Sequence, residues 1–150
     1  MRYLFLPGFL LSALLGCNSG SKKTETTAQS TDSTAVASAD TVCYRQVVGR
    51  DSTRLRLVIN GSTVAGELAV LPFEKDRAQG PISGTLTDNQ IRADWQRSGE
   101  GVSQVYEVTF TLAGDAVSWR EGERVEKAGR WVLKEPEKAY EYKLFKAECE

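Results

Sequence analysis

Strict alternation of apolar and polar residues is the feature that most limits what this chain can fold into. The run Arg54 to Ile59 places its leucines and isoleucine on one face and its arginines on the other. Successive side chains of a strand point to opposite faces, so this run would bury one face and leave the other in water. Asn60-Gly61 follows at once, and it predicts a hairpin because both central residues of a type I′ turn need positive φ.

The same period continues towards the end of the chain, and we expect no long helix. Alternating segments separated by turn residues lie at 63–71, 82–86, 91–95, 102–112 and 117–119. Gly66 and Gly84 lie inside two of them, and a glycine within a strand permits the sharp bending that a small closed barrel needs. Segments 130–134 and 140–147 predict two further strands, with one helical turn at 136–139 between them.

Eight or nine short strands in hairpin order predict an all-β fold, a small antiparallel up-and-down β-barrel occupying residues 42–150. The last strand would lie beside the first, around residues 43–48, because Cys149 and Cys43 would hold them together. Pairing the first strand with the last removes both open edges of the sheet.

The first sixteen residues have the character of an export signal. A positive charge at Arg2, a short apolar run and a small residue, Gly16, are typical of a secretory signal. The run is too short to span a bilayer, which takes ~20 apolar residues. Leu14-Leu15-Gly16-Cys17 resembles the lipobox of bacterial lipoproteins, which implies cleavage before Cys17 and lipid attachment to it. The alternative is an ordinary signal peptide with a cysteine nearby.

Lipid on Cys17 would anchor the chain to a membrane of the cell envelope, since two or three acyl chains give stable binding. Asn18 is not the aspartate that resembles an inner-membrane retention signal, which favours the outer membrane. Residues 18–40 contain ten Ser or Thr and no aromatic residue, so the stretch 17–41 predicts a disordered tether. As a flexible coil it would span roughly 25–30 Å.

The two remaining cysteines, Cys43 and Cys149, lie at the two ends of the predicted domain. In an oxidising compartment such a pair predicts a disulfide. The alternative, a reactive thiol pair, would favour close spacing and an electropositive site.

The remaining composition argues against several functions. The chain has no histidine, the commonest general base and transition-metal ligand. Its acidic and basic residues are evenly mixed, so no nucleic-acid partner is expected. No catalytic, zinc, P-loop or dinucleotide motif is present, and we expect no enzyme activity, no metal and no cofactor. The carboxylates of Glu121, Glu123 and Glu126 alternate with cations, which predicts a solvated loop.

Aromatic residues carry the only sign of a ligand. Trp95, Tyr106 and Trp119 fall on the apolar faces of neighbouring predicted strands, and Gln104 shares the face of Tyr106. They could line a cup for an apolar or ring-shaped ligand. Alternatively they fill the interior, since eight-stranded barrels are often packed solid.

Several features together resemble small bacterial lipoproteins of unknown function. These are the Leu-Leu-Gly-Cys sequence ending at Cys17, the Ser/Thr tether, Cys43-Tyr44-Arg45, the Gly-x-Ile-x-Gly-x-Leu pattern of residues 80–86, and Cys149. The resemblance implies a lipocalin-like or calycin-like barrel. A terminal disulfide on an anchored barrel is also similar to membrane-bound inhibitors of c-type lysozyme, although their inhibitory loop motif has no match here. We therefore expect a module that binds a small ligand or an envelope protein or, alternatively, an envelope-protection or lysozyme-inhibitor-like protein acting through surface loops.

Overall fold

The computed structural model describes residues 39–149, and in this part of the chain strands dominate. The predicted signal, Cys17 and most of the tether lie outside the described residues. The first strand begins at Asp40, slightly before the boundary predicted at residue 42. The described residues belong to one compact unit.

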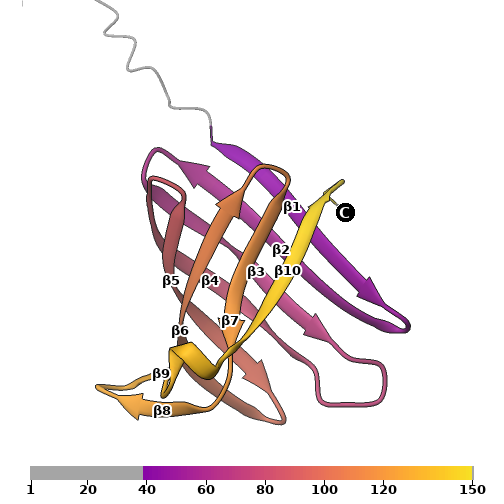
Figure 1. The fold of residues 1–150 in the computed structure, drawn as a ribbon, viewed down its shortest axis with the longest axis vertical. Coiled ribbons are helices and arrows are strands. Elements are labelled where there is room, and N and C mark those ends of the chain that lie inside the picture. The colour runs from indigo at the N-terminus through magenta and orange to yellow at the C-terminus, as the bar shows by residue number, and fades with distance from the viewer. Residues whose placement is uncertain (1–38, 150) are drawn as a thin grey trace, which may run out of the picture. The chain divides into compact units, whose positions relative to one another are not determined.

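The described elements are ten strands and one turn of 3-10 helix (Figure 1). They are β1 (Asp40–Val48), β2 (Asp51–Asn60), β3 (Thr63–Leu71), β4 (Ala78–Thr87), β5 (Gln90–Gly99), β6 (Val102–Ala113), β7 (Ala116–Glu121), β8 (Arg124–Lys127), β9 (Arg130–Leu133), η1 (Pro136–Lys138) and β10 (Tyr140–Ala147).

The prediction of a closed antiparallel barrel is confirmed. Strands β1 to β7 pair in sequence order, and β10 pairs with both β7 and β1, which closes an eight-stranded barrel. The seam between first and last strands runs from Cys43↔Ala147 to Arg45↔Phe145. The predicted disulfide joins Cys43 to Cys149 beside this seam, with a Cα–Cα distance of 5.2 Å.

The two ends of the barrel differ (Figure 1). Asp40, the hairpin turns after β2, β4 and β6, and the end of β10 lie at one end, called here the N-terminal end. The turns after β1 and β5 and the loop after β3 lie at the other, together with β8, β9 and η1. We call residues 122–139, which form these three elements, the insertion, and this end of the barrel the insertion end.

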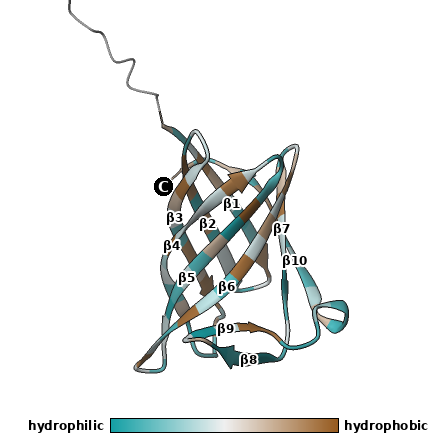
Figure 2. Ribbon diagram, turned by 90° about the vertical axis from the view of Figure 1, so that its left-hand side faces the viewer, coloured by the Kyte–Doolittle hydropathy of each residue, from teal (hydrophilic) through white to brown (hydrophobic). Residues whose placement is uncertain are grey.

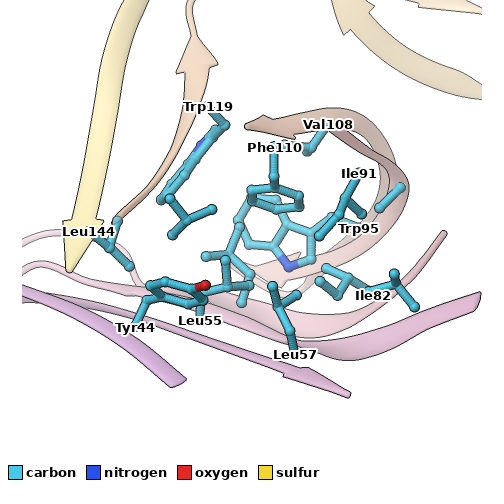
Figure 3. Packing of buried hydrophobic residues seen from close by; sticks show 14 of the residues in the cluster. Tyr44, Leu55, Leu57, Ile82, Ile91, Trp95, Val108, Phe110, Trp119 and Leu144 are labelled. Atoms are coloured by element: carbon cyan, nitrogen blue, oxygen red, sulfur yellow. The ribbon is translucent and has the colours of Figure 1, made fainter. Parts of the chain in front are cut away.

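The barrel interior is filled with apolar side chains (Figure 3). Leu57, Leu68, Phe110, Val117 and Leu144 are completely buried in it. Each such side chain stabilises the fold by about 1.5–3 kcal/mol relative to leaving it in water. The inward positions are those that the period-2 pattern predicts, except Val102, which is 54% exposed because β6 begins there, beyond the core.

Two mid-strand glycines permit the tight curvature, as expected. A Cβ atom at Gly66 would overlap the carbonyl oxygen of Arg56 on β2, and one at Gly84 would overlap that of Arg92 on β5. Only a residue without a side chain lets these neighbouring backbones approach so closely.

The first predicted turn is wrong in its register. Asn60 pairs with Thr63 at the end of the hairpin, so the central turn residues are Gly61 and Ser62, and of these only Gly61 has positive φ (58°). Positive φ at both central residues, which a type I′ turn needs, occurs instead at Glu100-Gly101 and Ala128-Gly129.

Candidate functional site

The barrel wall opens between β6 and β7. These strands pair only near their hairpin turn, from Thr111↔Ser118 to Ala113↔Ala116. Beyond that point β6 remains paired with β5, and β7 remains paired with β10. The insertion lies across the widening gap, and its strand β9 meets β6 in parallel at Tyr106↔Trp131 (Figure 2).

A groove of about 350 Å³ occupies this opening. Trp119 and Val108, both buried, lie at its base. Its walls are Glu107, Thr109 and Thr111 of β6, Ser118 and Arg120 of β7, Val132, Leu133 and Pro136 of the insertion, and Glu141 of β10. The groove has the size of a site for a small ligand.

Strand alternation explains the mixed chemistry of the groove. On β6, Val108 and Phe110 point into the barrel, so Glu107, Thr109 and Thr111 point outward, where the groove lies. The insertion adds the apolar side by bringing Val132, Leu133 and Pro136 over this polar edge. A ligand here would meet hydroxyl and charged groups on one side and apolar surface on the other.

A single buried arginine holds the insertion in place. The Arg124 guanidinium donates from Nε and Nη2 to the two carboxylate oxygens of Glu121, at 3.3 and 3.0 Å. Its Nη1 donates to the backbone carbonyls of Glu107 and Trp131, both at 2.9 Å. The Arg124 side chain is only 5% exposed. Arg124 therefore bonds to backbone of β6 and β9 where β6 and β7 no longer pair.

The prediction of a solvated loop is therefore wrong for Glu121 and its partner Arg124, whereas Glu123 and Glu126 are exposed as predicted. Part of the segment is strand β8, and Arg124 is almost fully buried. A guanidinium and a carboxylate that pair through two hydrogen bonds offset much of each other's desolvation cost. Alternation of charge along the sequence does not distinguish a buried, doubly hydrogen-bonded ion pair of this kind from a solvated surface.

Two further contacts tie the insertion to the barrel. Arg120 Nη1 donates to the carbonyl of Pro136 at 2.9 Å, which joins β7 to η1. Arg130 on β9 forms a salt bridge of 2.9 Å with Asp94 on β5. These contacts attach the insertion to the barrel at η1 and at the start of β9.

The four predicted cup residues fall into two groups. Trp95, Gln104 and Tyr106 lie together: the Trp95 and Tyr106 rings meet edge-on at 5.9 Å, and the Tyr106 hydroxyl donates to Gln104 Oε1 at 3.5 Å. The Tyr106 ring also lies 5.3 Å from the Arg97 guanidinium and 4.5 Å from that of Arg124. The three side chains of this group therefore contact one another.

Trp119 lies apart from that group, at the base of the groove. It contacts Phe110 edge-on at 5.6 Å and stacks on Tyr142 at 5.0 Å (Figure 3 shows Trp119 beside Phe110). Its indole Nε1 is buried with no hydrogen-bond partner among residues 39–149, and so is that of Trp95. An unmet buried donor costs about 1–3 kcal/mol, a cost usually seen where function or bound water requires it.

Tyr140, at the start of β10, is the residue near the groove whose pKa is shifted. Partial burial, the neighbouring Tyr142 with its hydrogen bond, and the carboxylate of Glu121 raise the pKa of Tyr140 to about 12, while the charge of Arg124 opposes this. The phenol therefore stays neutral and keeps its proton for hydrogen bonding at the insertion end.

Within 39–149, no group of three or more His, Cys, Asp or Glu side chains is placed to hold a metal ion. None of the helical structure in that range has the length and apolar character for a membrane span.

Sequence reasoning missed Arg124, Val132 and Leu133 as site residues. The available signal was the turn Ala128-Gly129 between two short segments that each contain apolar residues, which marks a hairpin. That the hairpin covers a gap in the barrel wall depends on tertiary structure and has no local signal.

No protein-family model matches this chain, and no curated protein or solved structure is significantly similar to it. The structure itself defines the class: a disulfide-closed antiparallel β-barrel with a packed interior and a lateral groove beneath an insertion.

Proposed function

We propose that this chain is a lipid-anchored lipoprotein of the cell envelope, with a lipocalin-like barrel, that binds a small ligand in the lateral groove. The observation that carries the proposal is the groove of about 350 Å³ over Trp119, in a barrel whose interior is otherwise filled. The binding site is thus moved from the barrel interior, where the aromatic pattern first suggested it, to the opening between β6 and β7.

The groove chemistry favours a ligand with two unlike sides. Val132, Leu133 and Pro136 offer an apolar surface for a ring or short chain. The hydroxyls of Thr109 and Ser118 can donate and accept hydrogen bonds on the facing side. This combination of apolar lining with a few polar groups is typical of small-molecule sites.

A groove-filling variant tests this proposal. Thr109 points outward into the groove, so Thr109→Trp would fill the groove with a large ring. Thr85→Trp, at an exposed position on β4 outside the groove, is the matched control. Protein purified from envelopes and analysed by native mass spectrometry should carry a bound small molecule in the wild type and in Thr85→Trp. The molecule should be lost in Thr109→Trp. Retention in the blocked variant, or no bound molecule in any of the three, would refute ligand binding in the groove.

The anchor is tested separately. Cells grown with an alkyne-labelled fatty acid should label the wild-type chain, and Cys17→Ala should abolish the label and release the domain from the membrane fraction. Membrane fractionation would then place the labelled chain in the outer or the inner membrane. An unlabelled wild-type chain would refute lipid attachment while leaving the groove proposal intact.

A second candidate function is protein binding through loops at the insertion end. Exposed large apolar side chains gather there: Val47, Val48, Phe73, Val102 and Tyr140. The loop after β3 is fixed to the first hairpin, since the Phe73 amide donates to Asp51 at 2.8 Å and the Arg50 guanidinium lies 2.9 Å from the Phe73 ring centre. A fixed apolar rim suits an envelope-protection or lysozyme-inhibitor role.

Lysozyme activity measures this second function directly. Residues 35–150, made as a disulfide-closed barrel, should inhibit c-type lysozyme, and Phe73→Ser combined with Val48→Ser should remove the inhibition. Unchanged lysozyme activity at high micromolar wild-type protein would rule this role out.

A further inference from the structure

We propose that the outer wall of β10, β1 and β2 docks on an anionic lipid surface. We call this surface the basic wall, defined by Lys143, Phe145, Arg45, Arg54 and Arg56. All five side chains are exposed. The proposal does not depend on the groove, although the groove wall at Ser118 and Glu141 adjoins Lys143.

The strand registers place these residues side by side. Phe145 pairs with Arg45 across the seam, and Arg45 pairs with Arg54 on β2. In the next row Cys43 pairs with Arg56. Residues directly opposite each other point to the same face of a sheet, so the arginines form one continuous surface. A shallow hollow of about 200 Å³ lies among them.

The basic wall brings like charges side by side on neighbouring strands. Like charges directly opposite each other on neighbouring strands destabilise a sheet, and Arg45 and Arg54 are such a pair. Glu67, opposite Arg56, and Glu148, which lines the same hollow, compensate part of the charge. Arg45 and Arg54 also interact within the chain, but each guanidinium has five N–H donors and can add contacts to phosphate.

Phe145 is the reason for choosing a lipid surface over a soluble anion. It is 55% exposed, and the Lys143 ammonium lies 5.6 Å from its ring centre. An aromatic ring surrounded by cations is typical of proteins that lie on a membrane, where the ring enters the headgroup region and the cations meet lipid phosphates. A soluble phosphate would use the arginines and leave the ring in water.

The opposite wall of the barrel lacks this character. On β5, the outward side chain of Asp94 forms a salt bridge of 2.9 Å with Arg130. Exposed Arg92 is the outward cation beside it. Arg92 therefore provides a matched control: the same type of residue, also exposed on a strand, but outside the basic wall.

The test uses residues 35–150 without the lipid anchor, since this compact unit contains the whole barrel and its disulfide. Vesicles of phosphatidylcholine, alone or with about one third phosphatidylglycerol, are mixed with the domain and separated by flotation. We expect binding to the anionic vesicles only, weakening as salt is raised. Arg56→Gln should weaken binding about fivefold, as expected for one cation near a membrane, and Arg92→Gln should leave it unchanged.

A second variant reports binding through a new fluorescence signal, so its result cannot be mistaken for the loss of binding that an unfolded variant would show. Phe145→Trp, at an exposed position, should show a blue shift of its fluorescence with anionic vesicles and none with phosphatidylcholine alone. Any of three outcomes would overturn the proposal: equal binding to both vesicle types or to neither, equal weakening by Arg56→Gln and Arg92→Gln, or displacement of the domain by millimolar inorganic phosphate at constant ionic strength. The last would indicate a soluble anion.

Discussion

The two sides of the barrel are held together by different means. On the side of β1 to β5, neighbouring strands pair along most of their length, as β2 and β3 do from Ser52↔Leu71 to Asn60↔Thr63. On the other side, the pairing of β6 with β7 ends at Thr111↔Ser118, and beyond it the side chain of Arg124 makes the bonds that connect the strands to the insertion.

This difference shows where binding surface can arise in a small barrel. In this eight-stranded barrel apolar side chains fill the interior, so a ligand site has to come from the wall. Where pairing is complete the wall is continuous. Where β6 and β7 separate, the insertion covers the gap incompletely, and the groove over Trp119 remains.

Removing the disulfide should have the largest effect on stability, and it acts at the short seam between β1 of the paired side and β10. Cys43→Ser combined with Cys149→Ser should lower the free energy of unfolding by about 4–5 kcal/mol, because the bond closes a long loop and restricts the unfolded chain. Urea denaturation measures the change. Thiol counting on the denatured wild type should find no free thiol in residues 35–150. A loss below about 1 kcal/mol would mean that the seam of β1 and β10 stays together in the unfolded chain.

Arg124→Ala tests the side where β6 and β7 separate, and it should cause the next largest loss in the free energy of unfolding. The substitution removes the guanidinium that pairs with the Glu121 carboxylate and that donates to the carbonyls of Glu107 and Trp131. Breaking a buried ion pair costs about 3–5 kcal/mol. We expect a value near 3 kcal/mol, because Glu121 keeps some solvent contact at 17% exposure.

Hydrogen exchange distinguishes local from global loss in this variant. Amides of β8 and β9 should exchange faster in Arg124→Ala while those of β2 and β3 remain protected. Lys127→Ala, an exposed position on β8, is the control and should change little. Equal effects of the two substitutions would mean that Arg124 does not hold the insertion.

The sequence allowed prediction of the fully paired side and not of the open side, for a physical reason. Alternation is local, so the inward faces of Leu55, Leu57 and Ile91 and the strand bounds of β10 could be inferred directly. The point at which β6 and β7 stop pairing depends on how each strand pairs with its other neighbour. That pairing is set by contacts between residues distant in sequence. The roles of Trp119 and Arg124 follow from that departure.

Gly66→Ala should perturb the fully paired side to a smaller extent. The added Cβ overlaps the carbonyl of Arg56, so β2 and β3 have to move apart, and such overpacking costs about 1–3 kcal/mol. Thermal unfolding monitored by circular dichroism measures it. Ala65→Ser, on the exposed face of the same strand, is the control. If Gly66→Ala is as stable as this control, the barrel wall is more adaptable than its register indicates.

Tyr140→Phe should have the smallest effect and concerns the open side alone. The pKa of Tyr140 is raised to about 12, above the value near 10 of an unfolded tyrosine. The folded state thus holds this proton more tightly, so its stabilising effect is complete below pH 10 and is lost as the pH rises from about 10 to about 12. Titration of tyrosinate absorbance should show one phenol ionising near pH 12 that is absent in Tyr140→Phe. The variant should also lose less stability than the wild type over that interval, since the remaining tyrosines are common to both proteins. If instead the missing phenol ionises near pH 10, Glu121 and Tyr142 do not surround Tyr140 in solution as they do in the structure, and the open side is looser than the contacts of Arg124 indicate.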